Sequence, residues 1–370
     1  MKRRLPVLQA SPLPSLYAAW IDTLLAGPIP HETEATCDDC AMCAPAGAPA
    51  DVSDFFFDPR TKCCTYIPTL VNYLVGRLLA DEDPACAAGR ATVETRLRAG
   101  VAVTPLGLQQ PPTFAVLYES TALNSFGRSP SLRCPHYLEE QGGRCGVWKH
   151  RASVCATWFC KHVRGATGMR FWRTLHQLLE TVERSLSHWC VLELDIGASA
   201  LARLFPAPTR PARSETAGQR TLDDLVNREA YRALWGHWYG READFYRECG
   251  RLVSGLSWDH VVAIGGPDVG VFSRLAREAY RRLTSDDIPA RLKVGALNVM
   301  RMDRKSCQVW AHDGADTLEL SKQLMDLFPY FDGRPTAEAL QAIEAVQGVR
   351  IDPALVRRLV DFKILVPHEP

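Results

Sequence analysis

Closely spaced cysteines in the first half of the chain constrain the fold more than any other sequence feature. The chain has 13 cysteines in 370 residues, well below the roughly 8–10% of a disulfide scaffold. Ten of them lie between Cys37 and Cys160. In a reducing compartment, clustered cysteines are more often metal ligands than disulfides, and an odd total fits poorly with full pairing. The pattern therefore predicts bound metal.

Nine of these cysteines are candidate metal ligands, and they fall into three groups. A C-x2-C-x2-C run comes first, then an adjacent pair, then a wider set that opens with Cys-Pro; the nine are Cys37, Cys40, Cys43, Cys63, Cys64, Cys134, Cys145, Cys155 and Cys160. A two-residue gap lets a tight turn aim two thiolates at one cation. We expect the groups to converge on one or two sites when the chain folds back.

Two kinds of metal site suit this ligand set, because iron–sulfur clusters and structural zinc both accept four thiolates. The first run opens like a bacterial ferredoxin motif, but Gly47 stands at the fourth position. Its fourth ligand must then come from elsewhere, and Cys63, Cys64 or Cys134 could serve. Nine candidates exceed the four ligands of one closed zinc site. Ligand softness and count favour iron–sulfur, such as a [4Fe–4S] cluster, with zinc as the alternative.

Basic residues bracket the last two cysteines of the third group. Arg151, Lys161 and Arg164 are candidates for binding a cofactor or an anionic substrate, or for offsetting thiolate charge. A solvated basic face that also includes Lys149 and His150 is an equal alternative.

Other neighbours have simpler interpretations. The aromatic residues Trp148, Trp158 and Phe159 are predicted to be core residues rather than a shield around a cluster. The histidines His136, His150 and His162 are possible further ligands, although a lone histidine is more often a hydrogen-bonded structural residue. The last three cysteines, Cys190, Cys249 and Cys307, are predicted to be small buried apolar residues.

At these residues the sequence resembles the YkgJ-type cysteine-cluster family, which is described as zinc- or iron-chelating. The family block C-P-[FY]-L…C-x-[IV]-[YW]-x-x-R-P-x-x-C is matched in order by Cys134, Pro135, Cys145, Val147, Trp148, Arg151 and Cys155. Ala152 replaces the family's proline, about twenty residues are inserted before Cys63, and Cys160 is an addition. The resemblance covers residues 31–190. Flagellin lysine methylases carry a similar cluster, which implies that such a site can serve a protein-modifying enzyme.

The rest of the chain predicts a mostly helical α+β fold. We expect an N-terminal arm over 1–30 that ends in a short helix, a metal-stapled cysteine-cluster domain over 31–203, a linker over 204–220, a helical region over 221–288 capped by Thr221, and a small module over 289–370. Helices are predicted at 66–80, 169–190, 241–255 and 270–283.

The C-terminal module combines strands and helices. Alternating runs predict two or three strands within 291–313, followed by a helix over 318–328, a turn over 332–336, and helices from Ala337 and Asp352. The pattern resembles winged-helix or PqqD-like peptide-recognition modules, which implies a peptide or protein substrate. An accessory cap that completes the fold is the alternative.

Charge and hydropathy exclude several classes of protein. The 43 basic and 42 acidic residues argue against nucleic-acid or membrane-surface binding. No stretch approaches the ~18 apolar residues of a membrane helix, and the interrupted N-terminal apolar run predicts a cytoplasmic protein. We expect an iron–sulfur protein that modifies a peptide or protein substrate. The alternative is a zinc-stabilised protein with a non-catalytic binding or structural role.

Overall fold

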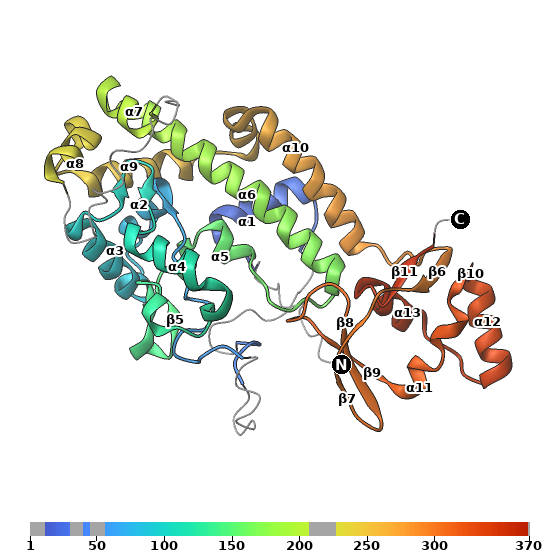
Figure 1. Cartoon of the computed structure of the whole chain (residues 1–370). Coiled ribbons are helices and arrows are strands. Elements are labelled where there is room, and N and C mark those ends of the chain that lie inside the picture. Colours follow the sequence, from blue (N-terminus) through green and yellow to red (C-terminus); the bar gives the residue numbers. More distant parts are fainter. Residues whose placement is uncertain (1–11, 30–39, 45–55, 207–226, 369–370) are drawn as a thin grey trace, which may run out of the picture. The chain divides into compact units, whose positions relative to one another are not determined.

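The computed structural model describes residues 12–29, 40–44, 56–206 and 227–368. Thirteen α-helices and eleven strands of two to five residues lie in these ranges (Figure 1), so the fold is mostly helical α+β, as predicted. Within the same ranges, no helix combines the length and the apolar character needed to cross a membrane.

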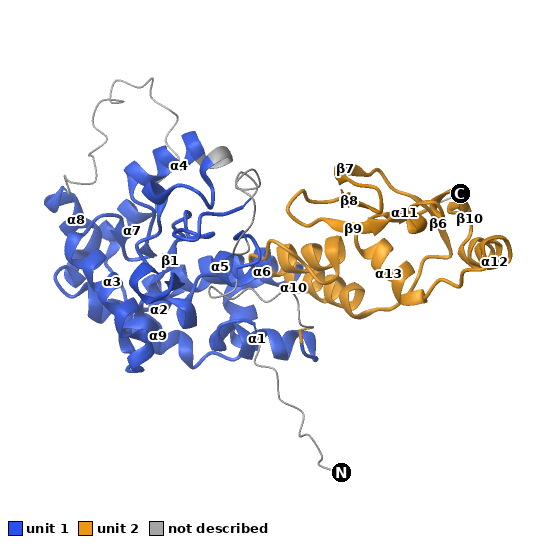
Figure 2. Cartoon of the chain, turned by 90° about the horizontal axis from the view of Figure 1, so that it is seen from below, with its two compact units in different colours: residues 1–28, 35–157, 176–271 blue, residues 29–34, 158–175, 272–370 orange. Residues whose placement is uncertain are grey.

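The chain divides into two compact units, which Figure 2 shows in different colours. Unit 1 comprises Met1–Pro28, Ala35–Thr157 and His176–Val271, and unit 2 comprises Ile29–Glu34, Trp158–Leu175 and Phe272–Pro370. The predicted module over 289–370 therefore lies within unit 2. Cys160 also belongs to unit 2, whereas the other described candidate ligands belong to unit 1.

Unit 1 is built from helices around short strands. Its helices are α1 (Ser15–Leu25), α2 (Asn72–Ala80), α3 (Ala87–Ala99), α4 (Pro112–Ser125), α5 (Ser153–Thr157), α7 (Ala198–Leu204), α8 (Arg228–Trp235) and α9 (Glu242–Ser254). Two longer helices, α6 (Gly165–Glu193) and α10 (Trp258–Thr284), contribute residues to both units. The helix predicted over 169–190 is confirmed by α6, whose Leu179, Val182 and Leu186 are fully buried.

Short antiparallel strands complete unit 1. They are β1 (Leu70–Val71), β2 (Val103–Thr104), β3 (Gly107–Leu108), β4 (Tyr137–Leu138) and β5 (Arg144–Cys145). The first three form a sheet in the order β1-β3-β2, and β4 pairs with β5. The helix predicted over 66–80 therefore begins later than expected, at Asn72, because Leu70 and Val71 are extended and pair with β3.

Helices α2 and α9 approach each other closely because glycines face the contact. A Cβ atom on Gly76 would lie 1.6 Å from the carbonyl oxygen of Tyr246, and one on Gly250 would lie 2.8 Å from the main-chain nitrogen of Arg77. Any side chain at Gly76 would force the two helices apart. This contact fixes α2, which leads directly into Asp81.

A buried carboxylate joins α1, α5 and α6 within unit 1. Glu183 accepts hydrogen bonds from the Tyr17 hydroxyl, from the Ser153 main-chain N–H (2.7 Å) and from the Ser153 hydroxyl (2.5 Å). Burial raises the pKa of Glu183 to about 7, against an ordinary value of 4.5. Near neutral pH this group is therefore partly protonated in the folded protein.

Unit 2 has two three-stranded sheets. Its strands are β6 (Arg291–Val294), β7 (Asn298–Met302), β8 (Ser306–Trp310), β9 (Leu318–Ser321), β10 (Asp332–Pro335) and β11 (Leu365–Pro367), in the orders β10-β6-β11 and β7-β8-β9. Its own helices are α11 (Lys322–Met325), α12 (Thr336–Gln347) and α13 (Pro353–Asp361). An apolar core that includes Val309, Ile343 and Leu359 unites them.

Two predictions for this module were wrong. The helix expected over 318–328 begins only at Lys322, because Leu318–Ser321 forms β9 and pairs with β8. Burial alternates along that strand, with Leu318 and Leu320 inside, as expected of a half-buried strand. The turn expected over 332–336 is largely strand β10, which pairs with β6. The helix predicted from Asp352 is confirmed, since its carboxylate accepts the Ala354 N–H.

The middle of the chain also differs from expectation. The predicted cap Thr221 and most of the predicted linker lie outside the described residues. The described helix α8 begins at Arg228, after Asn227 caps it by accepting the Ala230 N–H. The helix predicted over 270–283 lies in the second part of α10, which is made of two helical segments that meet at Gly266, where φ is 61°.

Replacing Gly76 with alanine should destabilise the fold, because the added methyl group meets main-chain atoms of α9. We expect Gly76→Ala to lower the free energy of unfolding by about 1–3 kcal/mol, the usual cost of overpacking. In contrast, the Cβ atom added by Gly270→Ala in α10 has no atom within 4 Å. This substitution should raise the free energy of unfolding by up to about 1 kcal/mol. Urea unfolding measures both values. Equal stability of the two variants would contradict the close packing of α2 and α9.

Glu183 should make stability depend on pH between its two pKa values. Its folded pKa of about 7 exceeds the ordinary 4.5, so its contribution is complete below the lower value and is lost as the pH rises through the higher one. Relative to Glu183→Gln, the free energy of unfolding of the wild type should fall by roughly 2 kcal/mol between pH 5 and pH 8. Urea unfolding at several pH values gives the difference. Parallel curves for the two proteins would show that Glu183 is not held in this state.

Candidate metal centre

The first cysteine group is joined to the chain that precedes the second. Within the C-x2-C turn, the Cys43 N–H donates to the Cys40 carbonyl (2.9 Å). The Phe57 N–H donates to the Met42 carbonyl (2.8 Å), and Cys43 forms an isolated bridge with Phe57. Burial and the neighbouring Cys40 raise the pKa of Cys43 to about 12. Cys37 lies outside the described residues.

A main-chain contact brings the second and third groups together. The Cys134 N–H donates to the Cys64 carbonyl (2.7 Å). From Cys134 the chain enters the β4-β5 hairpin, where Cys145 pairs with Tyr137. Helix α5 then carries Cys155. The structure thus places four segments, which come from all three cysteine groups, within one region of unit 1.

The thiols of these segments lie close enough to shift one another's pKa. Its hydrogen bond with Cys63, together with burial, holds the pKa of Cys64 far above its usual range, and the charges of Cys134 and Cys145 add to the shift. Desolvation of the thiol does the same to Cys155, although part of that residue is exposed, with further contributions from the charges of Cys145, Cys134 and Cys63. The charge of Cys63 also raises the pKa of Cys43, so the first cysteine group lies near the second. Ionising several of these thiols together therefore costs free energy.

The described cysteines are all free thiols. Cys63 and Cys155 are exposed, Cys134 is buried, and Cys40, Cys43, Cys64 and Cys145 are half-buried. The predicted ligand Cys160 is half-buried in unit 2. Seven of the nine predicted ligands are thus described within unit 1; Cys160 belongs to unit 2, and Cys37 lies outside the described residues.

The spacing of the thiols distinguishes between kinds of metal site. A tetrahedral zinc ion with Zn–S bonds of about 2.3 Å holds its sulfur atoms about 3.8 Å apart. Among the described residues, no three of the predicted cysteine ligands have sulfur atoms that all lie within 4.8 Å of one another. The thiolates of an iron–sulfur cluster bind different iron atoms and are spaced more widely.

His136, next to the third group, has an imidazole nitrogen whose lone pair is unused. The Thr92 hydroxyl lies 2.7 Å from the Gly89 carbonyl oxygen and 2.8 Å from His136 Nδ1. Since the hydroxyl donates its one proton to the carbonyl, Nδ1 carries the proton of the ring. Nε2 is then a bare acceptor, buried without a hydrogen-bond partner in the described chain. Burial lowers the pKa of His136 to about 3, so the ring is neutral, as a metal ligand must be.

The predicted cofactor-binding arginines contact the protein itself. Arg151 is buried and donates to the carbonyl oxygens of Pro12 (2.6 Å), Trp148 (2.8 Å) and Cys155 (3.3 Å). It therefore fixes the main chain at Cys155. Arg164 bonds to Asp361 and to two main-chain carbonyls of unit 2. Lys161 is half-buried in the same unit.

Burial changes several interpretations of the neighbouring residues. Trp148 and Trp158 are 40% and 54% exposed, so the prediction that they are core aromatics was wrong. Phe159 is half-buried and lies 4.3 Å from Trp172 between ring centroids. His150, Arg151 and His162 are buried, which rules out a solvated basic face at these residues. The last three cysteines, Cys190, Cys249 and Cys307, are fully buried, as predicted.

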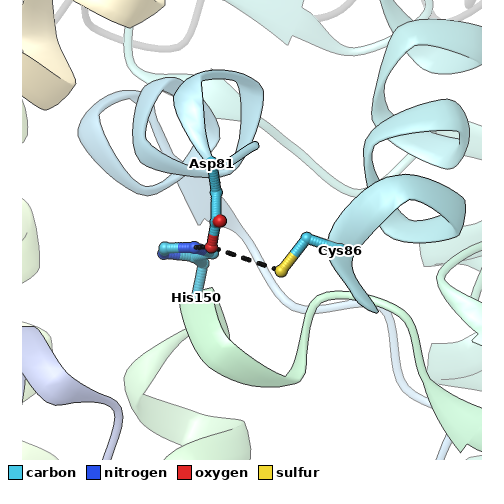
Figure 3. A group of neighbouring side chains, drawn as sticks. All are labelled: Asp81, Cys86 and His150. Carbon is cyan, nitrogen blue, oxygen red and sulfur yellow. Dashed lines mark hydrogen bonds and ion pairs between the residues drawn. The ribbon is translucent and has the colours of Figure 1, made fainter. Parts of the chain in front are cut away.

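Among the described residues, one group of three side chains does bring its ligand atoms close together. It consists of Asp81, Cys86 and His150 (Figure 3), whose ligand atoms all lie within 4.8 Å of one another. Sequence reasoning missed this group because Cys86 stands apart from the other cysteines and no motif spacing joins it to Asp81 or His150.

Comparison with known proteins finds no match to this chain among family models, curated proteins or solved structures. The resemblance to the YkgJ-type family therefore stays a prediction from sequence motifs.

The two adjacent thiols should differ in reactivity in reduced, metal-free protein. The hydrogen bond from Cys64 lowers the pKa of Cys63, and Lys62 contributes in the same direction. Because Cys63 is also exposed, iodoacetamide should alkylate it at least about tenfold faster than Cys64 near neutral pH. Cys64→Ala should slow the reaction at Cys63, whereas Cys190→Ala should not. Peptide mapping by mass spectrometry measures both rates, and faster labelling of Cys64 would contradict the assignment.

Proposed function

We propose that this chain is a metal-binding protein whose cysteine set holds an iron–sulfur cluster. The observation that carries the proposal is the convergence of Cys43, Cys63, Cys64, Cys134, Cys145 and Cys155. These residues come from four separate segments of unit 1, and the described ones form no disulfide. Bound metal would explain why these cysteines lie together, because a cation stabilises several thiolates that would otherwise repel one another.

The surroundings of the thiols support ligation. Lys62 is buried, donates to the Gly143 carbonyl (2.8 Å), and lowers the pKa of Cys63. Arg151 holds the main chain at Cys155. The bare Nε2 of His136 provides a further donor two residues from Cys134. An iron–sulfur cluster, when bound, supplies one-electron redox or Lewis-acid chemistry.

The alternative is a zinc-stabilised protein without catalytic activity. Zinc would pin the four segments and contribute its binding free energy to folding. The number of candidate thiolates, which exceeds the four ligands of one closed zinc site, supports iron–sulfur over this alternative. Metal analysis decides between the two.

We further propose that the chain is an enzyme of the YkgJ type that modifies a peptide or protein, with the region over 289–370 as a PqqD-like recognition module. The edge strand β7 supports this role. It pairs only with β8 in the described part of unit 2, and Val299, Met300 and Met302 are 55%, 41% and 58% exposed. An exposed apolar edge strand offers unpaired main-chain groups to an extended peptide.

Substitution of a converging cysteine should remove metal, whereas substitution of an isolated buried one should not. We expect anaerobically purified wild type to be brown and to contain iron and acid-labile sulfide. Cys155→Ala and Cys64→Ala should lose most of the iron and lower the melting temperature, because ligation free energy is also folding free energy. Cys190→Ala is the matched control and should keep its iron.

Metal analysis, visible absorption and thermal unfolding of the four proteins test this set of expectations. Colourless wild type whose zinc is lost in Cys155→Ala and Cys64→Ala would favour the zinc alternative. Protein without iron or zinc would refute metal binding at the cysteines, as would equal metal content in all four proteins.

A further inference from the structure

Three ligand atoms of different chemistry converge at Asp81, Cys86 and His150 in unit 1. The Asp81 carboxylate oxygen Oδ2 lies 2.8 Å from His150 Nε2 and 3.2 Å from the Cys86 sulfur. Figure 3 shows both side chains directed at this one oxygen. Cys86 and His150 are buried, and Asp81 is half-buried.

The main chain around these residues is fixed by contacts of its own. Asp81 follows α2, and Cys86 ends the 3-10 helix Pro84–Cys86 and precedes α3. Arg90 donates to the carbonyl oxygens of Asp81 and Asp83 across this connection. The Asp83 N–H donates to Asp81 Oδ1 (3.0 Å), which leaves Oδ2 for the sulfur and the imidazole.

A second contact fixes His150 relative to α3. A Cβ atom on Gly89 would lie 1.9 Å from the carbonyl oxygen of Gly146, so α3 and the chain after Cys145 meet through main-chain atoms. His150 lies four residues beyond Gly146, at the end of the 3-10 helix Trp148–His150. Both sides of the group are therefore preorganised.

We infer that Asp81, Cys86 and His150 bind one divalent cation of the zinc class, separately from the cysteine set. Thiolate, imidazole and carboxylate are the three ligand types of protein zinc sites, and a site with three protein ligands keeps its fourth position for water or substrate. Tetrahedral zinc places nitrogen and oxygen ligands about 3.4 Å apart and sulfur and oxygen ligands about 3.6 Å apart. The observed 2.8 and 3.2 Å need only small displacements.

Charge balance also fits this cation. One thiolate and one carboxylate neutralise a divalent ion, so the complex is neutral where two of its ligands are buried. Binding breaks the S–H bond of Cys86 and releases that proton to solvent. The neutral imidazole of His150 takes the tautomer with its proton on Nδ1, which frees the Nε2 lone pair for the metal, and metal bonds replace the two hydrogen bonds to Asp81. A nucleophilic cysteine does not fit the geometry, because the carboxylate rather than the imidazole contacts the sulfur.

The test uses full-length, reduced protein purified anaerobically and equilibrated with a zinc buffer. Zinc and iron per chain are measured for wild type, Cys86→Ser and His150→Gln, with Cys190→Ser and the exposed His260→Gln as matched controls. Serine and glutamine keep a hydrogen-bond donor near Asp81, so both site variants should fold. We expect each to bind one zinc fewer per chain, or to bind it at least about 100-fold more weakly, with iron unchanged. The controls should match wild type.

A second measurement, of thermal unfolding with added zinc, tests the site even if Cys86→Ser or His150→Gln fails to fold. Added zinc should raise the melting temperature of wild type, and Asp81→Asn should reduce that rise. Equal zinc content in wild type and both site variants would overturn the inference, and so would a wild-type melting temperature that zinc does not change. Loss of iron in Cys155→Ala concerns the cysteine set alone, so failures of the two proposals are distinguishable.

Discussion

The cost of ionising thiols that are gathered together is the constraint on which the rest of the structure depends. The charges of Cys134 and Cys145 add to burial in raising the pKa of both Cys64 and Cys155, so the ionised forms are unfavourable unless positive charge joins them. A metal centre removes this penalty and connects distant segments at the same time. A plain apolar core would not account for the adjacent Cys63, because that residue is exposed.

The helical part of unit 1 supplies the frame for both proposed metal sites. Glycine contacts between α2 and α9 fix the helix that leads into Asp81. The contact between Gly89 and Gly146 fixes the chain that carries Cys145 and His150. Positions that tolerate no side chain therefore determine where the ligand atoms lie, and the hydrogen bonds of Glu183 join the neighbouring helices α1, α5 and α6.

Much of this arrangement could be predicted from local sequence, and the remainder depends on tertiary contacts. Helical spacing predicted α6, and the position of Cys190 at the end of that amphipathic helix predicted its burial. Strand β9 was missed because Leu318–Ser321 is too short for its period to be recognised without its partner β8. The group at Asp81, Cys86 and His150 could not be predicted, because three unrelated segments meet there only through the packing of α2, α3 and the β4-β5 hairpin.

X-ray absorption of the anaerobically purified protein at the iron and zinc edges tests the central claim most directly. The account predicts iron whose ligands are mainly sulfur, with iron neighbours at short range, as in a polynuclear cluster. It also predicts zinc with mixed sulfur, nitrogen and oxygen ligands. Protein that contains neither metal, or iron with only oxygen and nitrogen ligands, would contradict the claim that the converging cysteines form a metal centre.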